Sequence, residues 1–168
     1  MDLDTTAACI TLILAPSSVR NIQATNISTH SIEITWYTPV EHKECINHYK
    51  LCYLLLPGQG NEGPFNESCI ETPEVTDYAL PIVQQINNLE PCAKYRIIIA
   101  PVTHEGKLGR QSMYEASTAI EPPGEPQNFQ VVKIQGNKIH LGWNRPVKNP
   151  WCVQRYGFHQ ANKLDDNL

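Results

Sequence analysis

Hydrophobic and polar residues alternate through residues 31–39. Ile32, Ile34 and Trp36 fall on one side of this pattern, and polar residues lie between them. A period of two is typical of a β-strand that buries one side and exposes the other. The pattern therefore predicts a strand in which Trp36 anchors a hydrophobic core rather than forming a binding site.

Comparable short segments, separated by Pro, Gly and Asn, continue to residue 119, without a sustained apolar run at helical spacing. Their lengths predict about seven strands and an all-β sandwich. Pro101 lacks an amide donor, so we expect the sixth strand to end or bulge there. The expected strands cover residues 19–24, 32–36, 46–53, 65–70, 80–86, 96–100 and 111–119, with a Pro- and Gly-rich hairpin loop at 57–64.

The chain contains an internal repeat. Trp143 follows Trp36 by 107 residues, and Tyr156 follows Tyr49 by the same interval. Many further matches of residue type share this offset without a gap, which predicts tandem modules. The expected units are a leader or remnant of a preceding module at 1–15, a complete module at 16–120, a Pro-rich linker at 121–126 and a truncated second module at 127–168.

The second copy contains counterparts of the first three strands alone. Residues 160–168 form a polar tail, and no counterpart of Tyr95 follows. Half of a sandwich leaves its core face open around Trp143. We therefore interpret the chain as a fragment, or a truncated gene model, of a longer array.

The charge balance argues against several classes of partner. The chain has 13 Lys and Arg against 17 Asp and Glu, a formal net charge of −4, whereas nucleic-acid surfaces are basic. The Lys and Arg residues are scattered and form no polybasic membrane patch. The apolar segment at residues 7–15 is too short to span a bilayer, and acidic residues precede it where a signal peptide is basic. We expect membrane attachment only through segments outside this chain.

Motifs for catalysis and cofactor binding are missing from the sequence. Neither Cys-x-x-Cys nor a His pair occurs at zinc spacing. No nucleophile elbow accompanies a Ser-His-Asp order, and no Gly-rich phosphate loop opens a helix. We expect the chain to be no enzyme and to use no cofactor, no metal and no small-molecule substrate.

Cysteines and glycosylation sequons indicate an oxidising compartment. Six Cys are many for a cytosolic protein of 168 residues. Asn26 and Asn66 each begin an Asn-x-Ser triplet that can accept a glycan, and Asn26 falls in a predicted turn at residues 26–29. Together these features favour an extracellular or cell-surface location.

The spacing of Leu89, Pro91 and Tyr95 resembles a tyrosine corner. In this arrangement a Tyr near the start of a strand directs its hydroxyl to upstream backbone while its ring stays in the core. Joined to the strand pattern around Trp36 and Tyr49, the corner resembles the fibronectin type III module. The resemblance covers residues 16–120 fully and 123–159 in part.

This resemblance implies an immunoglobulin-like sandwich, with strands A, B and E in one sheet and C′, C, F and G in the other. It implies one complete module plus the first strands of a second. The expected core residues are Trp36, Tyr49, Leu89 and Tyr95, with Trp143 and Tyr156 in the second module.

The cysteines are candidates for three disulfides. Cys52 and Cys69 flank the hairpin loop and are expected to bridge strands C and C′. In the implied topology, a strand of roughly 25 Å separates Cys45 from Cys92, too far for a bond. We hypothesise that Cys92 bonds to Cys152 of the next module. Cys45 then pairs with a preceding module or with Cys9; a free Cys92 thiol and a different pairing within the first module remain alternatives.

The exposed loops at residues 41–44, 77–79 and 104–110 are the expected contact surface, since loops on a rigid sandwich often carry binding. The resemblance implies a non-catalytic binding and spacer module that acts in adhesion or ligand recognition. Its expected partners are a protein ligand or neighbouring modules. The alternative is an ectodomain fragment of a receptor enzyme, such as a receptor-type tyrosine phosphatase, whose catalytic domain is absent from this chain.

Overall fold

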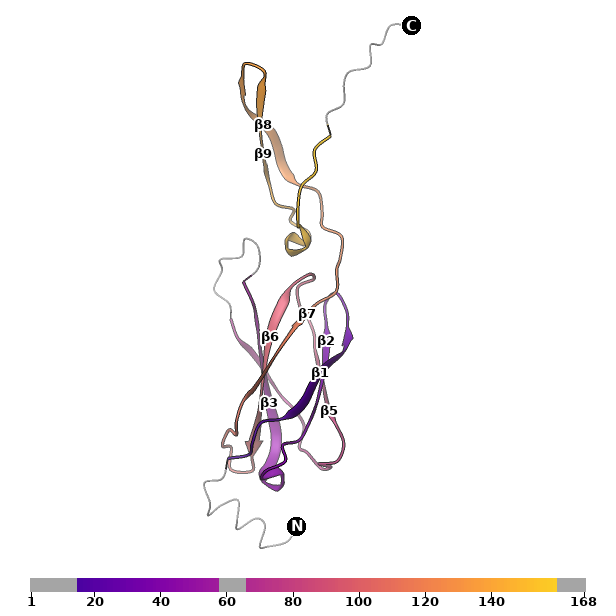
Figure 1. Ribbon diagram of the computed structural model, residues 1–168, viewed down its shortest axis with the longest axis vertical. Helices are drawn as coiled ribbons and strands as arrows, with labels where there is room; N and C mark the ends of the chain where they lie inside the picture. Colours follow the sequence, from indigo (N-terminus) through magenta and orange to yellow (C-terminus); the bar gives the residue numbers. More distant parts are fainter. Residues whose placement is uncertain (1–14, 58–65, 160–168) are drawn as a thin grey trace. The chain divides into compact units, whose positions relative to one another are not determined.

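The chain divides into two compact units, residues 1–121 and 122–168. The computed structural model describes residues 15–57 and 66–159. Strands β1 to β7 belong to the first unit, and β8 and β9 to the second (Figure 1). Within the described ranges, no helix has the length and apolarity needed to cross a membrane.

The first unit is a sandwich of two antiparallel sheets (Figure 1). This confirms the all-β, immunoglobulin-like fold predicted from the sequence. One sheet has the order β1-β2-β5, formed by Arg20–Ile27, Ile32–Tyr37 and Ile82–Ile86. The other has the order β4-β3-β6-β7, formed by Ser68–Glu71, Ile46–Leu55, Lys94–Thr103 and Ser112–Ser117.

The hydrophobic core lies between these sheets. Ile32, Ile34 and Trp36 of β2 are each 0% exposed, as their alternation predicts. The Trp36 ring meets the Tyr49 ring of β3 edge-on, with ring centroids 5.5 Å apart, a favourable arrangement for two aromatic rings. A shift of one residue in the pairing of β2 would turn all three side chains to solvent.

Pro101 does not end β6, which was one of the two outcomes predicted for it. The strand continues to Thr103, and the Gly109 amide donates a hydrogen bond to the Pro101 carbonyl (2.8 Å). The N and O atoms of one strand residue point to the same side, so the missing donor of Pro101 faces the loop after β6 and not β3. The register between β3 and β6 is irregular between Ile46 and His48, close to this site.

Two further boundaries differ from the sequence prediction. β1 extends through Asn26 to Ile27, because the turn that follows is tightened by Ser28, whose hydroxyl accepts a hydrogen bond from the Ser31 amide (2.9 Å). The charged loop before β3 contains a 3-10 helix, η1 (Lys43–Cys45).

The described part of the second unit, residues 122–159, contains an antiparallel hairpin, β8 (Gln127–Gln135) with β9 (Lys138–Asn144), followed by the 3-10 helix η2 (Pro150–Cys152). Trp143 packs edge-on against Tyr156, with ring centroids 5.3 Å apart. Trp143 and Tyr156 are both half-buried.

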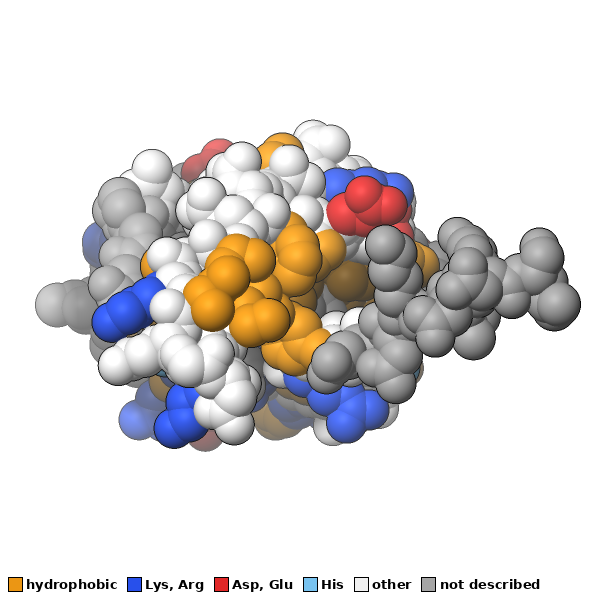
Figure 2. Space-filling view, turned by 90° about the horizontal axis from the view of Figure 1, so that it is seen from above, with side chains coloured by type: hydrophobic (Ala, Val, Ile, Leu, Met, Phe, Trp, Pro, Cys, Tyr) orange, Lys and Arg blue, Asp and Glu red, His pale blue; other side chains and the backbone are white. Residues whose placement is uncertain are grey.

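The third strand predicted for the second copy is wrong for the described residues, because residues 153–159 form no strand. Its counterpart β3 pairs with β6 in the first unit, and residues 122–159 contain no equivalent of β6. The hairpin's apolar side chains are therefore exposed, with Phe129 at 61% and Ile139 at 62%. Figure 2 shows hydrophobic side chains gathered on the surface seen from above.

Replacing Trp36 with Ala is expected to lower the free energy of unfolding of the first unit by about 3–5 kcal/mol, because it empties a fully buried site. Denaturant unfolding followed by circular dichroism measures the loss. Trp143→Ala removes the same side chain from the other unit and is expected to change the first unit's stability by less than about 0.5 kcal/mol. A loss below about 1 kcal/mol for Trp36→Ala would show that this indole is not part of the core.

Candidate functional site

The turn between β5 and β6 contains the tyrosine corner. The Glu90 amide donates a hydrogen bond to the Tyr95 hydroxyl (2.8 Å), as the spacing of Leu89 and Tyr95 predicts. Leu89 is 4% and Tyr95 6% exposed, so both rest in the core. Burial raises the pKa of the Tyr95 hydroxyl, which keeps this hydrogen-bonding group neutral.

Thr118, the residue that follows β7, stabilises the same turn. Its hydroxyl accepts a hydrogen bond from the Ala93 amide (3.0 Å) and donates one to the Glu90 carbonyl (2.7 Å). The side chain is buried, so both partners depend on it. The role of Thr118 cannot be predicted from the sequence, because its partners lie 25 and 28 positions away and a single Thr carries no local signal.

Cys92 occupies this turn in a left-handed backbone conformation, with φ at 55°. Its amide donates a hydrogen bond to the Ala119 carbonyl (3.1 Å), and its Sγ accepts one from the Glu121 amide (3.4 Å). These contacts hold the Cys92 sulfur at the end of the first unit, where the predicted linker begins.

Cys45 lies at the opposite end of the first unit. It closes η1 directly before β3, and the His104 amide donates a hydrogen bond to its carbonyl (3.3 Å). Cys45, Cys92 and Cys152 are each part of a disulfide bond. Cys9 lies outside the described residues, and the pairing of these four cysteines stays a prediction.

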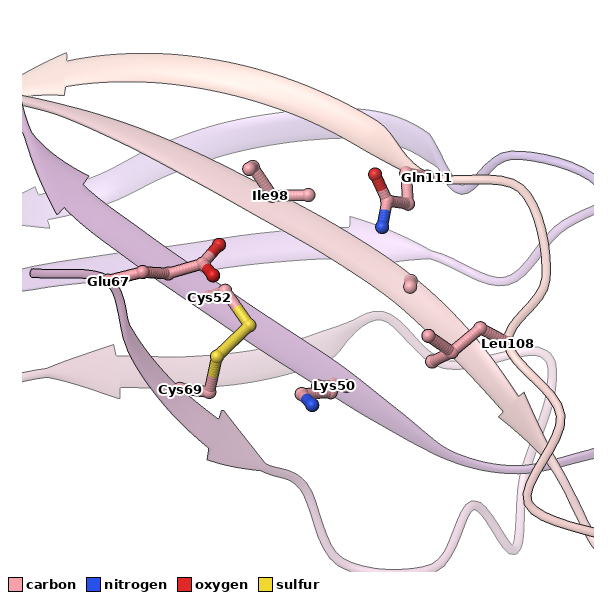
Figure 3. Close-up of a pocket in the computed structure, with 8 residues that line it drawn as sticks. Lys50, Cys52, Glu67, Cys69, Ile98, Leu108 and Gln111 are labelled. Carbon is pink, nitrogen blue, oxygen red and sulfur yellow. A yellow bond between two sulfur atoms is a disulfide. The ribbon is translucent and has the colours of Figure 1, made fainter.

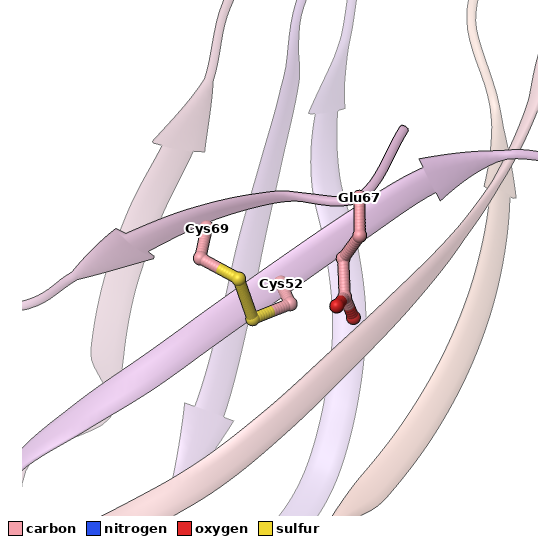
Figure 4. Close-up of side chains that lie close together, drawn as sticks. All are labelled: Cys52, Glu67 and Cys69. Carbon is pink, nitrogen blue, oxygen red and sulfur yellow. A yellow bond between two sulfur atoms is a disulfide. The ribbon is translucent and has the colours of Figure 1, made fainter. Parts of the chain in front are cut away.

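Cys52 and Cys69 form a disulfide between β3 and β4 (Figure 4). The two residues face each other in the register, with Cα atoms 4.0 Å apart. The bond fastens the short edge strand β4 to the centre of its sheet. The hairpin loop that it closes lies mostly outside the described residues.

A small pocket of about 140 Å³ lies beside this disulfide (Figure 3). Lys50, Glu67, Ile98, Leu108 and Gln111 line it together with the disulfide. Sites for drug-sized ligands and cofactors enclose roughly 300–1,000 Å³. The pocket is therefore too small to hold a molecule of that size.

The Glu67 carboxylate approaches the two sulfur atoms, and the three groups lie within 4.8 Å of one another (Figure 4). Such a cluster has the residue types of a zinc site, but zinc binds thiolates. The sulfurs of Cys52 and Cys69 are bonded to each other, so they cannot act as thiolate ligands. In this oxidised form the cluster does not fit a metal.

The three predicted contact loops lie at one end of the sandwich. Residues 41–44 lead into β3, and residues 104–110 follow β6 where its end pairs with the start of β3. The third loop, residues 77–79, joins this end because the Tyr78 hydroxyl donates a hydrogen bond to the Ile46 carbonyl (3.0 Å).

The two sequons lie toward the other end. Asn26 is exposed near the end of β1, two residues before Ser28, whose carbonyl accepts a hydrogen bond from the Ala119 amide (2.8 Å). Asn66 is exposed just before β4, where Ser68 pairs with Tyr53. Neither Asn has its side chain buried, so both can accept a glycan without disturbing the core.

The first unit has the architecture of an immunoglobulin-like module that presents loops from a disulfide-supported sandwich. The sequence profile of the Fibronectin type III domain matches residues 16–116. The chain belongs to the fibronectin type III family, whose domain is a non-catalytic type of module.

The known proteins with similar sequences are much longer than this chain. The chain is 23% identical over 140 residues to the tyrosine-protein phosphatase Lar of Drosophila melanogaster, covering 83% of this chain and 6% of that protein. It is 27% identical over 156 residues to the cell adhesion molecule DSCAM of Gallus gallus, covering 89% of this chain and 7% of that protein. It therefore spans a small part of each relative.

A solved structure supports the fold. The third fibronectin III domain of human KIAA0343 protein superimposes with a TM-score of 0.51 at 15% identity, covering 67% of this chain and 90% of that domain. At this identity the likeness concerns architecture alone.

Replacing both Cys52 and Cys69 with Ser is expected to lower the free energy of unfolding by about 3 kcal/mol, because the open hairpin gains entropy in the unfolded state. Urea unfolding of the variant and the parent, both without reductant, measures the difference. Adding a reductant should not lower the free energy of unfolding of the variant any further through this pair, because the bond between residues 52 and 69 is already absent. An unchanged midpoint in the double variant would contradict a stabilising role for this bond.

Thr118→Val is expected to cost about 1–3 kcal/mol, because it leaves the Ala93 amide and the Glu90 carbonyl without their buried partner. Thr118→Ser keeps the hydroxyl and serves as the matched control, with most of the stability retained. Thermal unfolding compares the three proteins. Equal stability of the Val and Ser variants would show that the hydroxyl does not hold the corner.

Proposed function

We propose that this chain is a non-catalytic binding and spacer module of an extracellular or cell-surface protein, acting in adhesion or ligand recognition. The observation that carries the proposal is the grouping of three exposed loops at one end of a rigid, disulfide-supported sandwich. Loops held by such a scaffold can contact a partner without losing much conformational entropy, because their ends are already ordered.

The chemistry of the loops favours a protein as the partner. The loop at residues 104–110 combines a Lys107–Glu105 ion pair (2.9 Å) with the apolar side chain of Leu108, which is 49% exposed. Mixed charge around an apolar centre suits a protein surface. The pocket beside Cys52 is too small for a cofactor, and the net charge of −4 disfavours nucleic acid.

An oxidising, extracellular setting accounts for the covalent chemistry. Disulfides persist outside the cytosol, and the chain has one between Cys52 and Cys69. Asn26 and Asn66 are both exposed and both lie in sequons. Placed away from the loop end, glycans at these positions leave the proposed contact surface open.

The spacer role rests on the tandem arrangement. We propose that residues 127–168 begin a second module after a linker at 121–126. Left-handed backbone conformations at Asn21 and His42 recur at Asn128 and Asn149, at the offset of the sequence repeat. A linker with Pro122 and Pro123 is stiff, so tandem modules joined by it set a distance.

A second candidate is a segment of a receptor enzyme such as a receptor-type tyrosine phosphatase. The similarity to tyrosine-protein phosphatase Lar favours it. In that case the chain still binds or spaces, while catalysis belongs to another domain. Sequencing the transcript beyond the codon for Leu168 separates the candidates: a downstream transmembrane helix and phosphatase domain support the second one.

The proposed setting predicts glycans on Asn26 and Asn66. Expression in a eukaryotic secretory pathway, behind a heterologous leader, should yield a mass above the 18.9 kDa of the polypeptide, lowered by an N-glycosidase. Asn26→Gln and Asn66→Gln are each expected to remove one glycan, and Asn21→Gln, outside any sequon, none. A secreted chain with the bare polypeptide mass would contradict the proposal.

A further inference from the structure

We propose that Cys92 and Cys152 form a disulfide that ties the first module to the segment beyond its linker. The inference rests on the proposed oxidising setting. It adds a covalent bond to the spacer role, and it follows from the contacts that each unit makes with its own part of the linker.

The backbone at Cys92 indicates that its sulfur is needed. A left-handed conformation, here with φ at 55°, disfavours any residue with a Cβ atom and suits Gly. The turn bears this strain at Cys92 although a Gly would relieve it. Chemistry that a Gly cannot supply accounts for a Cys at this position.

The first unit places the Cys92 sulfur against the beginning of the linker. The Cys92 amide donates a hydrogen bond to the Ala119 carbonyl (3.1 Å), and the Glu121 amide donates one to the Cys92 Sγ (3.4 Å). Thr118 also fixes the preceding turn. The sulfur therefore has a fixed position next to Glu121.

The second unit places the segment before Cys152 against the next residue of the linker. The Asn149 side-chain amide donates a hydrogen bond to the Pro122 carbonyl (3.1 Å), and the Gly124 amide donates one to the Lys148 carbonyl (3.0 Å). One 3-10 turn connects Asn149 to Cys152, whose amide donates to the Asn149 carbonyl (3.0 Å).

The contacts of the two cysteines lead to neighbouring residues of the linker. Glu121 and Pro122 are consecutive, so their Cα atoms are about 3.8 Å apart. The Cys92 sulfur is hydrogen-bonded to Glu121, and Asn149, which begins the turn before Cys152, is hydrogen-bonded to Pro122. A disulfide requires Cα atoms about 4.4–6.8 Å apart, a separation that these short connections allow.

The other pairings of Cys92 do not meet this requirement. Cys52 and Cys69 are bonded to each other. Cys45 lies beside the end of β6 near Thr103, while Cys92 precedes its start at Lys94, and a strand of that length covers about 30 Å.

Cys9 is a poor partner because of the short segment that joins it to the sandwich. The Pro16 carbonyl accepts a hydrogen bond from the Arg110 amide (2.9 Å), which fixes Pro16 at the loop end of the sandwich. The seven Cα–Cα steps from Cys9 to Pro16 extend at most about 24 Å, so Cys9 could reach Cys92 only if this segment ran fully extended along the whole length of β6. Cys152 is the remaining partner.

Bond formation follows thiol–disulfide exchange with a protein disulfide or glutathione disulfide as the oxidant. The thiolate of one cysteine attacks the oxidant, forms a mixed disulfide and releases one thiol of the oxidant. The thiolate of the second cysteine then attacks the mixed disulfide, forms the bond between Cys92 and Cys152 and releases the other thiol of the oxidant. Two protons leave the cysteines, and two electrons reside on the reduced oxidant.

Peptide mapping without reduction tests the bond in the full chain. Cleavage with trypsin and a glutamyl endopeptidase puts every cysteine on a separate peptide. The bond after Glu90 precedes Pro and resists cleavage, so the Cys92 peptide begins at residue 75. The peptides with Cys9, Cys45, Cys52, Cys69, Cys92 and Cys152 span residues 1–20, 45–50, 51–62, 68–71, 75–94 and 149–155.

We expect peptide 75–94 to be linked to peptide 149–155, both in the secreted chain and in chain refolded in a glutathione redox buffer. Linkage of 75–94 to any other peptide overturns the proposal, as does an alkylated Cys92 in both preparations. A linked pair in a chain that carries no glycan would sustain this bond while the proposed function fails.

Two variants give a matched comparison. Cys152→Ser is expected to expose the Cys92 thiol to alkylation in unreduced protein, from none to one equivalent at peptide 75–94. Cys45→Ser removes a cysteine at the other end and should leave Cys92 unlabelled. Because the first unit has its own core, labelling reports on Cys92 even if Cys152→Ser unfolds the second unit. An unlabelled Cys92 in Cys152→Ser contradicts the bond.

Discussion

The edge-on contact between Trp36 and Tyr49 joins the two sheets of the sandwich. Both residues are fully buried, and each holds its strand in the register that turns the alternating Ile and Leu residues inward. Everything that the first unit presents to solvent depends on this packing. The loops at one end and the sequons toward the other are positioned by strands whose inner faces meet at this pair.

A second constraint acts where the chain turns between β5 and β6. Tyr95 and Thr118 satisfy the backbone groups of that turn, so it can be buried without unpaired donors. The rigidity they create extends to Cys92, whose sulfur is held beside Glu121. The core, the corner and the beginning of the predicted linker thus form one continuous set of contacts, through which the proposed bond at Cys92 would act on the proposed spacing of modules.

The sequence predicts the parts of this structure that have a local or periodic signal. Alternation identifies β2, and the spacing of Leu89 and Tyr95 identifies the corner. The symmetric placement of Cys52 and Cys69 about a Pro- and Gly-rich loop points to their bond. Each of these signals depends on strand geometry or turn chemistry within a short segment.

Features that depend on distant partners were missed or mispredicted. Pro101 remains within β6 because its missing donor faces a loop, and the side to which it points is set by pairing that alternation does not specify. Thr118 acts on residues 25 and 28 positions away. Residues 153–159 have the pattern of a strand, but a strand forms only where a neighbour satisfies its backbone.

Native-state hydrogen exchange of the full, disulfide-bonded chain tests most directly whether the Trp36–Tyr49 core organises the molecule. We predict that the slowest amides lie in β2, β3 and β6, the strands that carry the buried residues around this pair. The hairpin of β8 and β9, with its exposed apolar side chains, should exchange much faster. Equal or stronger protection in β8 and β9 than in β2 and β3 would contradict it.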